Sequence, residues 1–211
     1  MTQNRDALYE IMTGQPVIPV IVIDNADDAV PMAQALVAGG LPAIEITLRT
    51  DAALESIERI AKEVPEAIVG AGTVLNGNQY EKVVSAGARF AVSPGFTREI
   101  AAAALGSAVP LLPGSTSASE IMRAIELGYT LLKFFPAEQA GGAPFLKSLS
   151  SPFSGVQFCP TGGVSPSNAK DYLSLPNVLC VGGSWVVPKD AVEAGDWARV
   201  EALAKEASQL A

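Results

Sequence analysis

Histidine is absent from the 211-residue sequence. Its absence excludes Ser-His-Asp triads, Cys-His nucleophile pairs and zinc sites with histidine ligands. The only two cysteines, Cys159 and Cys180, lie in apolar runs without C-x-x-C spacing, which supports neither a zinc site nor a redox motif. We interpret both as reduced core residues. The sequence therefore predicts no metal site and a cytoplasmic protein.

Charged residues are also scarce, at 17%, whereas 49% of the residues are hydrophobic, so the chain can bury a sizeable core in one domain. Fourteen basic against twenty-two acidic residues give a net charge of −8, and the basic residues form no cluster. We therefore expect no nucleic-acid partner. The uncharged stretch 100–119 is interrupted by glycine and proline, and we expect no membrane segment. A small metabolic anion remains possible, because backbone N–H groups and one or two cations can hold it.

Short apolar runs alternate with helical patterns along the whole chain, which indicates repeated βα units. The predicted strands are 17–23, 43–48, 67–73, 90–94, 110–114, 131–136, 157–162 and 178–184. The predicted helices are 27–38, 51–63, 78–86, 97–105, 117–127, 144–149, 167–172 and 191–209. The sequence Ser117-x-x-Glu120 is a capping box that marks the start of the fifth helix.

Eight βα units without a linker predict an α/β protein with a closed (β/α)8 TIM barrel. We expect a single domain over residues 1–211, with a short helix before the first strand. The alternative is an open doubly wound sheet with a dinucleotide site at 70–75. That segment, GAGTVL, lacks the third glycine of the fingerprint.

One lysine lies inside an otherwise apolar strand. In the run 131–136 (LLKFFP), period-two alternation places Lys133 on the face that points into the barrel. Desolvation favours a neutral, nucleophilic amine, which attacks ketones to form Schiff bases. The alternative is a structural lysine paired with a carboxylate.

The run 43–49 (AIEITLR) places polar side chains on one face and apolar ones on the other. Glu45 is a candidate for proton transfer, and Arg49 at the strand end can hold a carboxylate by two hydrogen bonds. The alternative is a local ion pair between these two residues.

Further polar residues and glycines stand at the ends of other strands, where barrels place their active sites. Thr73 could donate its hydroxyl to the same carboxylate, and Thr161 could reach a substrate oxygen, although either could instead cap a helix. The glycines after the last two strands lie in segments 161–163 and 182–184, where barrels commonly bind phosphate. Ordinary use of glycine in tight turns is the alternative.

Taken together, these segments resemble the 2-keto-3-deoxy-6-phosphogluconate (KDPG) aldolases, which also act as 4-hydroxy-2-oxoglutarate (KHG) aldolases. The resemblance runs nearly end to end. It is carried by 19–22 (PVIV), 45–50 (EITLRT), 70–75 (GAGTVL), 93–95 (SPG), 133–138 (KFFPAE), 158–163 (FCPTGG) and 182–185 (GGSW). At 113–117 (PGSTS) the chain differs from the PGIST expected of the family.

The resemblance implies a class I aldolase that needs no cofactor or metal and is usually a homotrimer. It implies that Lys133 forms a Schiff base with pyruvate and that Glu45 is the general acid/base. Arg49 and Thr73 would hold the pyruvate carboxylate, and Thr161 would govern aldehyde stereochemistry. The implied phosphate pocket and remaining substrate contacts are Gly162, Gly163, Ser184, Gly182, Gly183, Pro94 and Phe135.

The expected reaction is reversible cleavage of KDPG to pyruvate and glyceraldehyde 3-phosphate, as in the Entner-Doudoroff pathway, together with cleavage of KHG to pyruvate and glyoxylate. One alternative keeps the mechanism but changes the substrate, to an unphosphorylated or epimeric 2-keto-4-hydroxy acid or to oxaloacetate for decarboxylation. Another is a barrel that binds a keto acid without turning it over.

Overall fold

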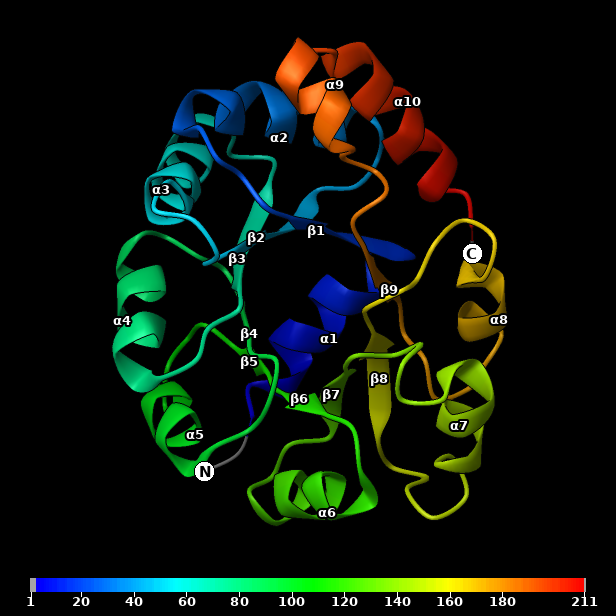
Figure 1. Cartoon of the computed structure of the whole chain (residues 1–211). Coiled ribbons are helices and arrows are strands. Elements are labelled where there is room, and N and C mark those ends of the chain that lie inside the picture. Colours follow the sequence, from blue (N-terminus) through cyan, green and yellow to red (C-terminus); the bar gives the residue numbers. More distant parts are fainter. Residues whose placement is uncertain (1–2, 211) are drawn as a thin grey trace.

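Parallel strands form the centre of the computed structural model, which describes residues 3–210 (Figure 1). They are β1 (Val17–Ile21), β2 (Ala43–Thr47), β3 (Ile68–Gly72), β4 (Ala91–Val92), β5 (Leu111–Leu112), β6 (Gly114–Ser115), β7 (Leu131–Phe134), β8 (Gln157–Pro160) and β9 (Val181–Gly183). Each overlaps one of the eight predicted runs. The fifth run is divided into β5 and β6 at Pro113, which has no N–H group to donate.

The strands form two sheets, with the orders β5-β4-β3-β2-β1-β9 and β6-β7-β8. The first strand pairs with the last, in the register Val17 with Val181. Isolated parallel bridges, Phe158 with Val178 and Thr161 with Gly182, connect the chain around β8 to the chain around β9. Both sheets curl around a common interior (Figure 1). Because every pairing is parallel, the strands of each sheet end at the same edge.

The helices lie outside the strands, except for α1, which lies inside the curl (Figure 1). They are α1 (Arg5–Thr13), α2 (Ala29–Ala38), α3 (Ala53–Glu63), α4 (Gly77–Ser85), α5 (Arg98–Ala104), α6 (Ala118–Glu126), α7 (Gly142–Ser148), α8 (Ala169–Leu173), α9 (Lys189–Ala194) and α10 (Trp197–Ala207), with a 3-10 turn η1 (Ala26–Asp28). The predicted capping box forms at Ser117 and Glu120. Within residues 3–210, no helix combines the length and apolar character that a membrane crossing requires.

The prediction of one continuous helix over 191–209 is wrong. The chain leaves α9 at Gly195, which has a left-handed φ of 64°. Asp196 then starts α10, because its carboxylate accepts a hydrogen bond from the backbone N–H of Arg199 at 3.1 Å. Glycine is typical of a helix end and aspartate of a helix start, so Gly195 and Asp196 are the signal in the sequence that could have revealed the break.

The alternation of side chains along the strands separates two regions of core. In β2, Ile44 and Ile46 face the outer helices and belong to the larger core cluster. Ala43 belongs to a smaller inner cluster, which also contains Leu8 and Met12 of α1. Helix α1 thus fills one end of the interior with apolar side chains.

The start of α1 is held by the buried side chain of Gln3. Its Nε2 donates to the carbonyls of Leu111 and Leu131 at 3.0 and 2.9 Å. Its Oε1 accepts from the N–H groups of Thr130 and Leu131, both at 3.1 Å. One side chain therefore satisfies four backbone groups at the ends of β5 and β7.

We predict that Gln3→Ala lowers the free energy of unfolding by about 2–4 kcal/mol, because leaving a buried backbone group unpaired costs about 1–3 kcal/mol and these losses add only in part. Chemical denaturation followed by circular dichroism measures the change. Gln209→Ala, at an exposed position of the C-terminal segment, is the matched control. Equal stability of the two variants would contradict the proposed role of Gln3.

Candidate active site

A buried ion pair joins the two sheets. Lys133 on β7 and Glu45 on β2 lie with Nζ and Oε1 3.2 Å apart, and their side chains are only 5% and 4% exposed. The predicted inward orientation of both residues is therefore confirmed. The pairing of Lys133 with a carboxylate also agrees with the structural alternative, so the contact alone does not distinguish that role from a chemical one.

The neighbouring strand leaves room for this pair. Gly72 on β3 lies so close that a Cβ atom there would be 2.1 Å from Glu45 Oε1, so any larger residue would displace the carboxylate. On the other side, Lys133 Nζ lies 5.3 Å from the centre of the Phe135 ring. The amine is thus held between a carboxylate and an aromatic ring.

Arg49 and Thr73 come together at the ends of β2 and β3. The Nε of Arg49 donates to Thr73 Oγ1 at 3.2 Å. Thr73 has a left-handed φ of 58°, which is uncommon outside glycine and is found mostly at sites where the surrounding structure holds it. Thr73 is not a helix cap, because Asn76 caps α4. The Glu45–Arg49 ion pair is also wrong, since in the described chain Glu45 pairs with Lys133.

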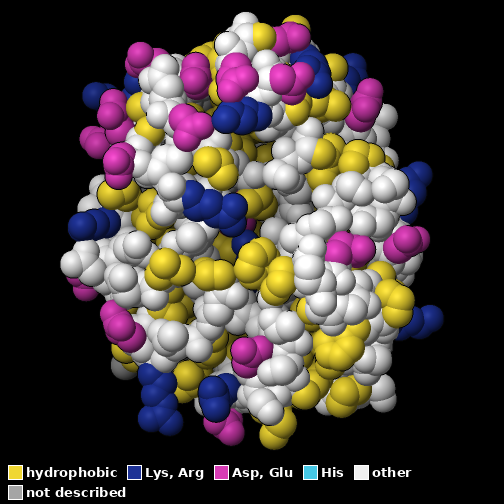
Figure 2. Space-filling model, in the orientation of Figure 1, with side chains coloured by type: hydrophobic (Ala, Val, Ile, Leu, Met, Phe, Trp, Pro, Cys, Tyr) yellow, Lys and Arg dark blue, Asp and Glu magenta, His cyan; other side chains and the backbone are white. Residues whose placement is uncertain are grey.

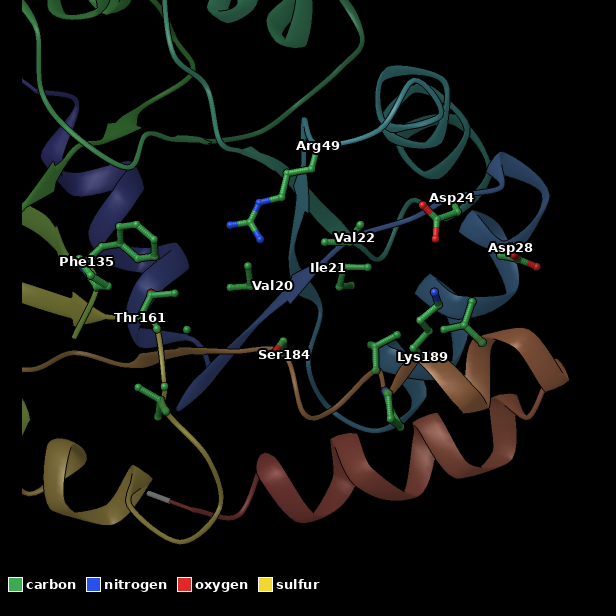
Figure 3. Close-up of a pocket in the computed structure, with 18 of the residues that line it drawn as sticks. Val20, Ile21, Val22, Asp24, Asp28, Arg49, Phe135, Thr161, Ser184 and Lys189 are labelled. Carbon is green, nitrogen blue, oxygen red and sulfur yellow. The ribbon is translucent and has the colours of Figure 1, made fainter. Parts of the chain in front are cut away.

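A pocket of about 990 Å³ opens above these residues, at the carboxyl ends of the strands. Of the sequence-predicted residues, those that line it are Arg49, Phe135, Thr161, Gly162, Gly163, Gly182 and Ser184. Figure 3 shows Phe135 and Thr161 toward one end of the pocket, with Arg49 and Ser184 on opposite sides of its middle. Helix α8 begins after Asn168, so Thr161 is not a helix cap either.

The other predicted site residues do not line this pocket. Lys133 and Glu45 are almost completely buried. Thr73 does not line the pocket but is hydrogen-bonded to Arg49, which does. The space next to Gly183 is filled by the indole ring of Trp185. The carbonyl group of Pro94 packs against Gly114.

The loop after β8 turns its carbonyl groups away from solvent. The carbonyls of Thr161 and Gly162 accept from the backbone N–H groups of Ala137 and Glu138, at 2.8 and 3.1 Å. No hydrogen bond within residues 3–210 involves the N–H groups of Gly162 and Gly163. Since both glycines line the pocket, these donors are available to an anion there.

Charged residues at the outer end of the pocket were missed by the sequence interpretation. Asp24, Asp28 and Glu193 line this end together with Lys189, which pairs with Glu193 at 3.6 Å. Figure 3 places Asp24, Asp28 and Lys189 at the end opposite Phe135. Figure 2 shows a basic side chain at the edge of a central hollow and acidic side chains gathered toward the top of the view. Their position directly after strands β1 and β9 is the signal that could have identified them.

Cys159 and Cys180 are free, buried thiols, as predicted. A hydrogen bond with Cys159 and complete burial raise the pKa of the Cys180 thiol well above its ordinary value. Cys180 is therefore a core residue and a poor nucleophile. Within the described part of the chain, no three histidine, cysteine or acidic side chains gather in a way that could hold a metal ion.

The sequence and structure were compared with known proteins. Residues 8–203 match the family model "KDPG and KHG aldolase". The KHG/KDPG aldolase of Escherichia coli (strain K12) is 56% identical over 207 residues, which cover 98% of this chain and 97% of the relative. The 2-dehydro-3-deoxy-phosphogluconate aldolase of Dickeya dadantii is 54% identical over 207 residues, with the same coverage of both chains.

Two solved structures of aldolases superpose closely. The KDPG aldolase of Legionella pneumophila, with pyruvate captured at low pH as a covalent carbinolamine intermediate, has a TM-score of 0.93 and 48% identity over 95% of this chain and 98% of that one. The enzyme of Zymomonas mobilis ZM4 with 3-phosphoglycerate has a TM-score of 0.92 and 51% identity, with 98% and 97% coverage.

We predict that Gly163→Ala lowers the free energy of unfolding by about 1–3 kcal/mol, because left-handed backbone is strained for alanine. The φ of Gly163 is 77°, and a Cβ atom there would be 2.6 Å from Cγ of Glu138. Thermal unfolding measures the change. Gly155→Ala is the control, since open space surrounds a Cβ at that position. A Gly163 variant as stable as the control would show that the loop tolerates a side chain.

Proposed function

The chain belongs to the KDPG and KHG aldolase family and is therefore a lyase, and from this premise we propose that Lys133, Glu45 and Arg49 carry out its aldol cleavage. The substrates are KDPG, which gives pyruvate and glyceraldehyde 3-phosphate, and KHG, which gives pyruvate and glyoxylate. The observation that carries the assignment is the 3.2 Å contact between a buried amine and a buried carboxylate next to an arginine-lined pocket.

The first half of the reaction forms a covalent bond to the enzyme. The Nζ of Lys133 attacks the C2 ketone, and the carbinolamine loses water to give a protonated imine. Glu45 lies at hydrogen-bond distance from this nitrogen, so it can supply and remove the protons of both steps. The carbinolamine with pyruvate in the Legionella pneumophila structure supports this sequence of steps.

The second half breaks the C3–C4 bond. Glu45 removes the proton of the C4 hydroxyl, the aldehyde leaves, and the bonding electrons move into the protonated imine to form an enamine. Glu45 then returns a proton to C3, and water hydrolyses the imine to release pyruvate from Lys133. The imine is the electron sink, so the mechanism requires neither a metal nor a cofactor.

Substrate binding is assigned to two groups of residues, one for the keto acid and one for the phosphate. Arg49, held by Thr73, binds the carboxylate of the keto acid by two hydrogen bonds. Thr161 contacts the reacting hydroxyl and sets its stereochemistry, with Phe135 bordering the keto acid. Next to Thr161, the N–H groups of Gly162 and Gly163 bind the phosphate with Ser184, supported by Gly182 and Gly183. The 3-phosphoglycerate in the Zymomonas mobilis structure supports a site for a phosphorylated acid.

We also propose that the two sheets form one closed (β/α)8 barrel, a single domain over residues 1–211. Only Pro113 separates β5 from β6, the two isolated bridges connect β8 to β9, and β9 pairs with β1. These contacts support a continuous ring in which β5 and β6 count as one strand. The proposed location is the cytoplasm, where both cysteines stay reduced.

The proposed assembly is a homotrimer. Met122 and Ile125 lie one turn apart on α6 and are 55% and 41% exposed, which is unusual for large apolar side chains close together. We predict that sedimentation equilibrium gives three copies of the 21.8 kDa chain. The Met122→Glu/Ile125→Glu variant should dissociate into single chains. A monomeric wild type would contradict the trimer.

We predict that Lys133→Ala abolishes pyruvate release from KDPG and KHG, and that Glu45→Gln lowers kcat by about 100- to 10,000-fold, the range for general acid–base catalysis. A lactate dehydrogenase-coupled assay measures pyruvate. Lys147→Ala, at an exposed position of α7, is the control. Near-normal cleavage by Lys133→Ala would overturn the assignment.

Removing Lys133 alone leaves the Glu45 carboxylate buried without its partner, which costs about 3–5 kcal/mol. Circular dichroism therefore accompanies each assay, and the Lys133→Met/Glu45→Gln variant removes both charges at once. A folded but inactive double variant separates loss of chemistry from loss of structure. Binding of pyruvate without turnover by the wild type would favour a keto-acid-binding barrel instead.

A further inference from the structure

Asn168 directly precedes α8, but its side chain does not cap that helix. Asparagine at this position usually accepts a hydrogen bond from an N–H group of the first helical turn. Here the carboxamide points back to the loop after β8. Its Nδ2 donates to the carbonyl of Gly163 at 3.1 Å, and its Oδ1 accepts from the backbone N–H of Ser165 at 2.8 Å.

This contact differs from those of the two preceding carbonyls. Thr161 and Gly162 are bonded to backbone N–H groups, whereas the Gly163 carbonyl is bonded to a side chain. The peptide that joins Gly163 to Val164 follows a left-handed glycine, where backbone rotation is least restricted. Of the three peptides, it is therefore the one whose orientation is fixed by a side chain, which a substitution can remove.

The orientation of this peptide decides whether the partial negative charge of its carbonyl oxygen or the partial positive charge of its N–H group faces the pocket. The Gly163 carbonyl is directed at Asn168, which does not line the pocket. If the peptide rotated by half a turn, the carbonyl oxygen and the N–H of Val164 would exchange directions. A carbonyl oxygen repels an anion that N–H groups attract. Gly163 and Val164 both line the pocket, so the two orientations have opposite effects on a bound phosphate.

The opposite side of Gly163 is packed as well. A Cβ atom on Gly163 would lie 2.6 Å from Cγ of Glu138, and the carboxylate of Glu138 accepts a hydrogen bond from the buried hydroxyl of Tyr172. Burial and this hydrogen bond raise the pKa of Tyr172, so its hydroxyl keeps its proton and remains a donor. Glu138 is thus held in place from α8, the same helix that Asn168 precedes.

From these contacts we propose that Asn168 is a positioning residue that selects for phosphorylated substrates. It holds the Gly163 carbonyl away from the pocket and so keeps the loop N–H groups directed at the phosphoryl group. Asn168 itself neither contacts the reacting carbons nor moves a proton. The inference rests on the proposed aldolase function and deepens it by assigning the choice between phosphorylated and unphosphorylated substrates.

The test compares KDPG with KHG in Asn168→Ala and Asn168→Asp. Aspartate has the shape of asparagine but cannot donate to the Gly163 carbonyl. We expect KM for KDPG to rise about 10- to 100-fold. This factor corresponds to the loss of one hydrogen bond between a loop N–H group and the charged phosphoryl group. We expect kcat for KDPG, and both constants for KHG, to stay within about twofold, because KHG lacks the phosphoryl group.

A merely structural role would not produce this difference between substrates. Calorimetric titration with 3-phosphoglycerate provides a readout without catalysis, and its Kd should weaken by the same factor. Ser165→Ala removes the hydroxyl contacts to Asn168 at 3.4 Å and to Ser167 at 2.8 Å but keeps the Ser165 N–H, so it should behave as wild type. Asn78→Asp, at an exposed position, controls for the added charge.

Four outcomes are informative. Folded Asn168 variants that bind 3-phosphoglycerate as wild type does would overturn the proposal, and so would equal rises in KM for both substrates. If the Asn168 variants do not fold, Tyr172→Phe gives a second test, because it removes the hydrogen bond that holds Glu138. This variant should raise KM for KDPG by a smaller factor and leave KM for KHG unchanged. If the wild type cleaves neither substrate, the proposed function itself fails.

Discussion

The buried contact between Lys133 and Glu45 is the interaction on which the rest of the site depends. Removing an ammonium and a carboxylate from water costs several kcal/mol for each ion, and only a short contact offsets that cost. The contact in turn requires that β2 and β7, in different sheets and 88 positions apart, face one interior. The curl of the sheets and the glycine at position 72 therefore serve the chemistry as much as the packing.

The charge of the residues that line the pocket differs from one part of it to another. A chain of net charge −8 can therefore bind an anionic substrate. Arg49 lines the middle of the pocket, and the loop of Gly162 and Gly163 offers N–H groups. Acidic residues, including Asp24 and Asp28, lie at the outer end. Local donors in a low-dielectric site outweigh distant charges, which salt and water screen. Overall charge therefore does not determine which small anion binds.

Alternating apolar and polar residues along the strands predict both the βα order and the inward orientation of Lys133 and Glu45, because the period of two is a local property. Contacts between distant strands are not local, so the sequence left open whether Glu45 pairs with Lys133 or with Arg49. The break at Gly195 escaped prediction because the helix was extended past a glycine and an aspartate, which favour a helix end and a helix start. The family resemblance supplied the residue roles, which spacing alone did not.

The measurement that tests the account most directly is the intact mass of the wild-type protein after treatment with pyruvate and sodium borohydride, followed by peptide mapping. Borohydride reduces an imine to a stable secondary amine, so the nucleophile keeps the pyruvate carbon skeleton. The account predicts one reduced pyruvyl group per chain, attached to Lys133. No adduct, or an adduct on an exposed lysine such as Lys62, would contradict a Schiff base at the Lys133–Glu45 pair.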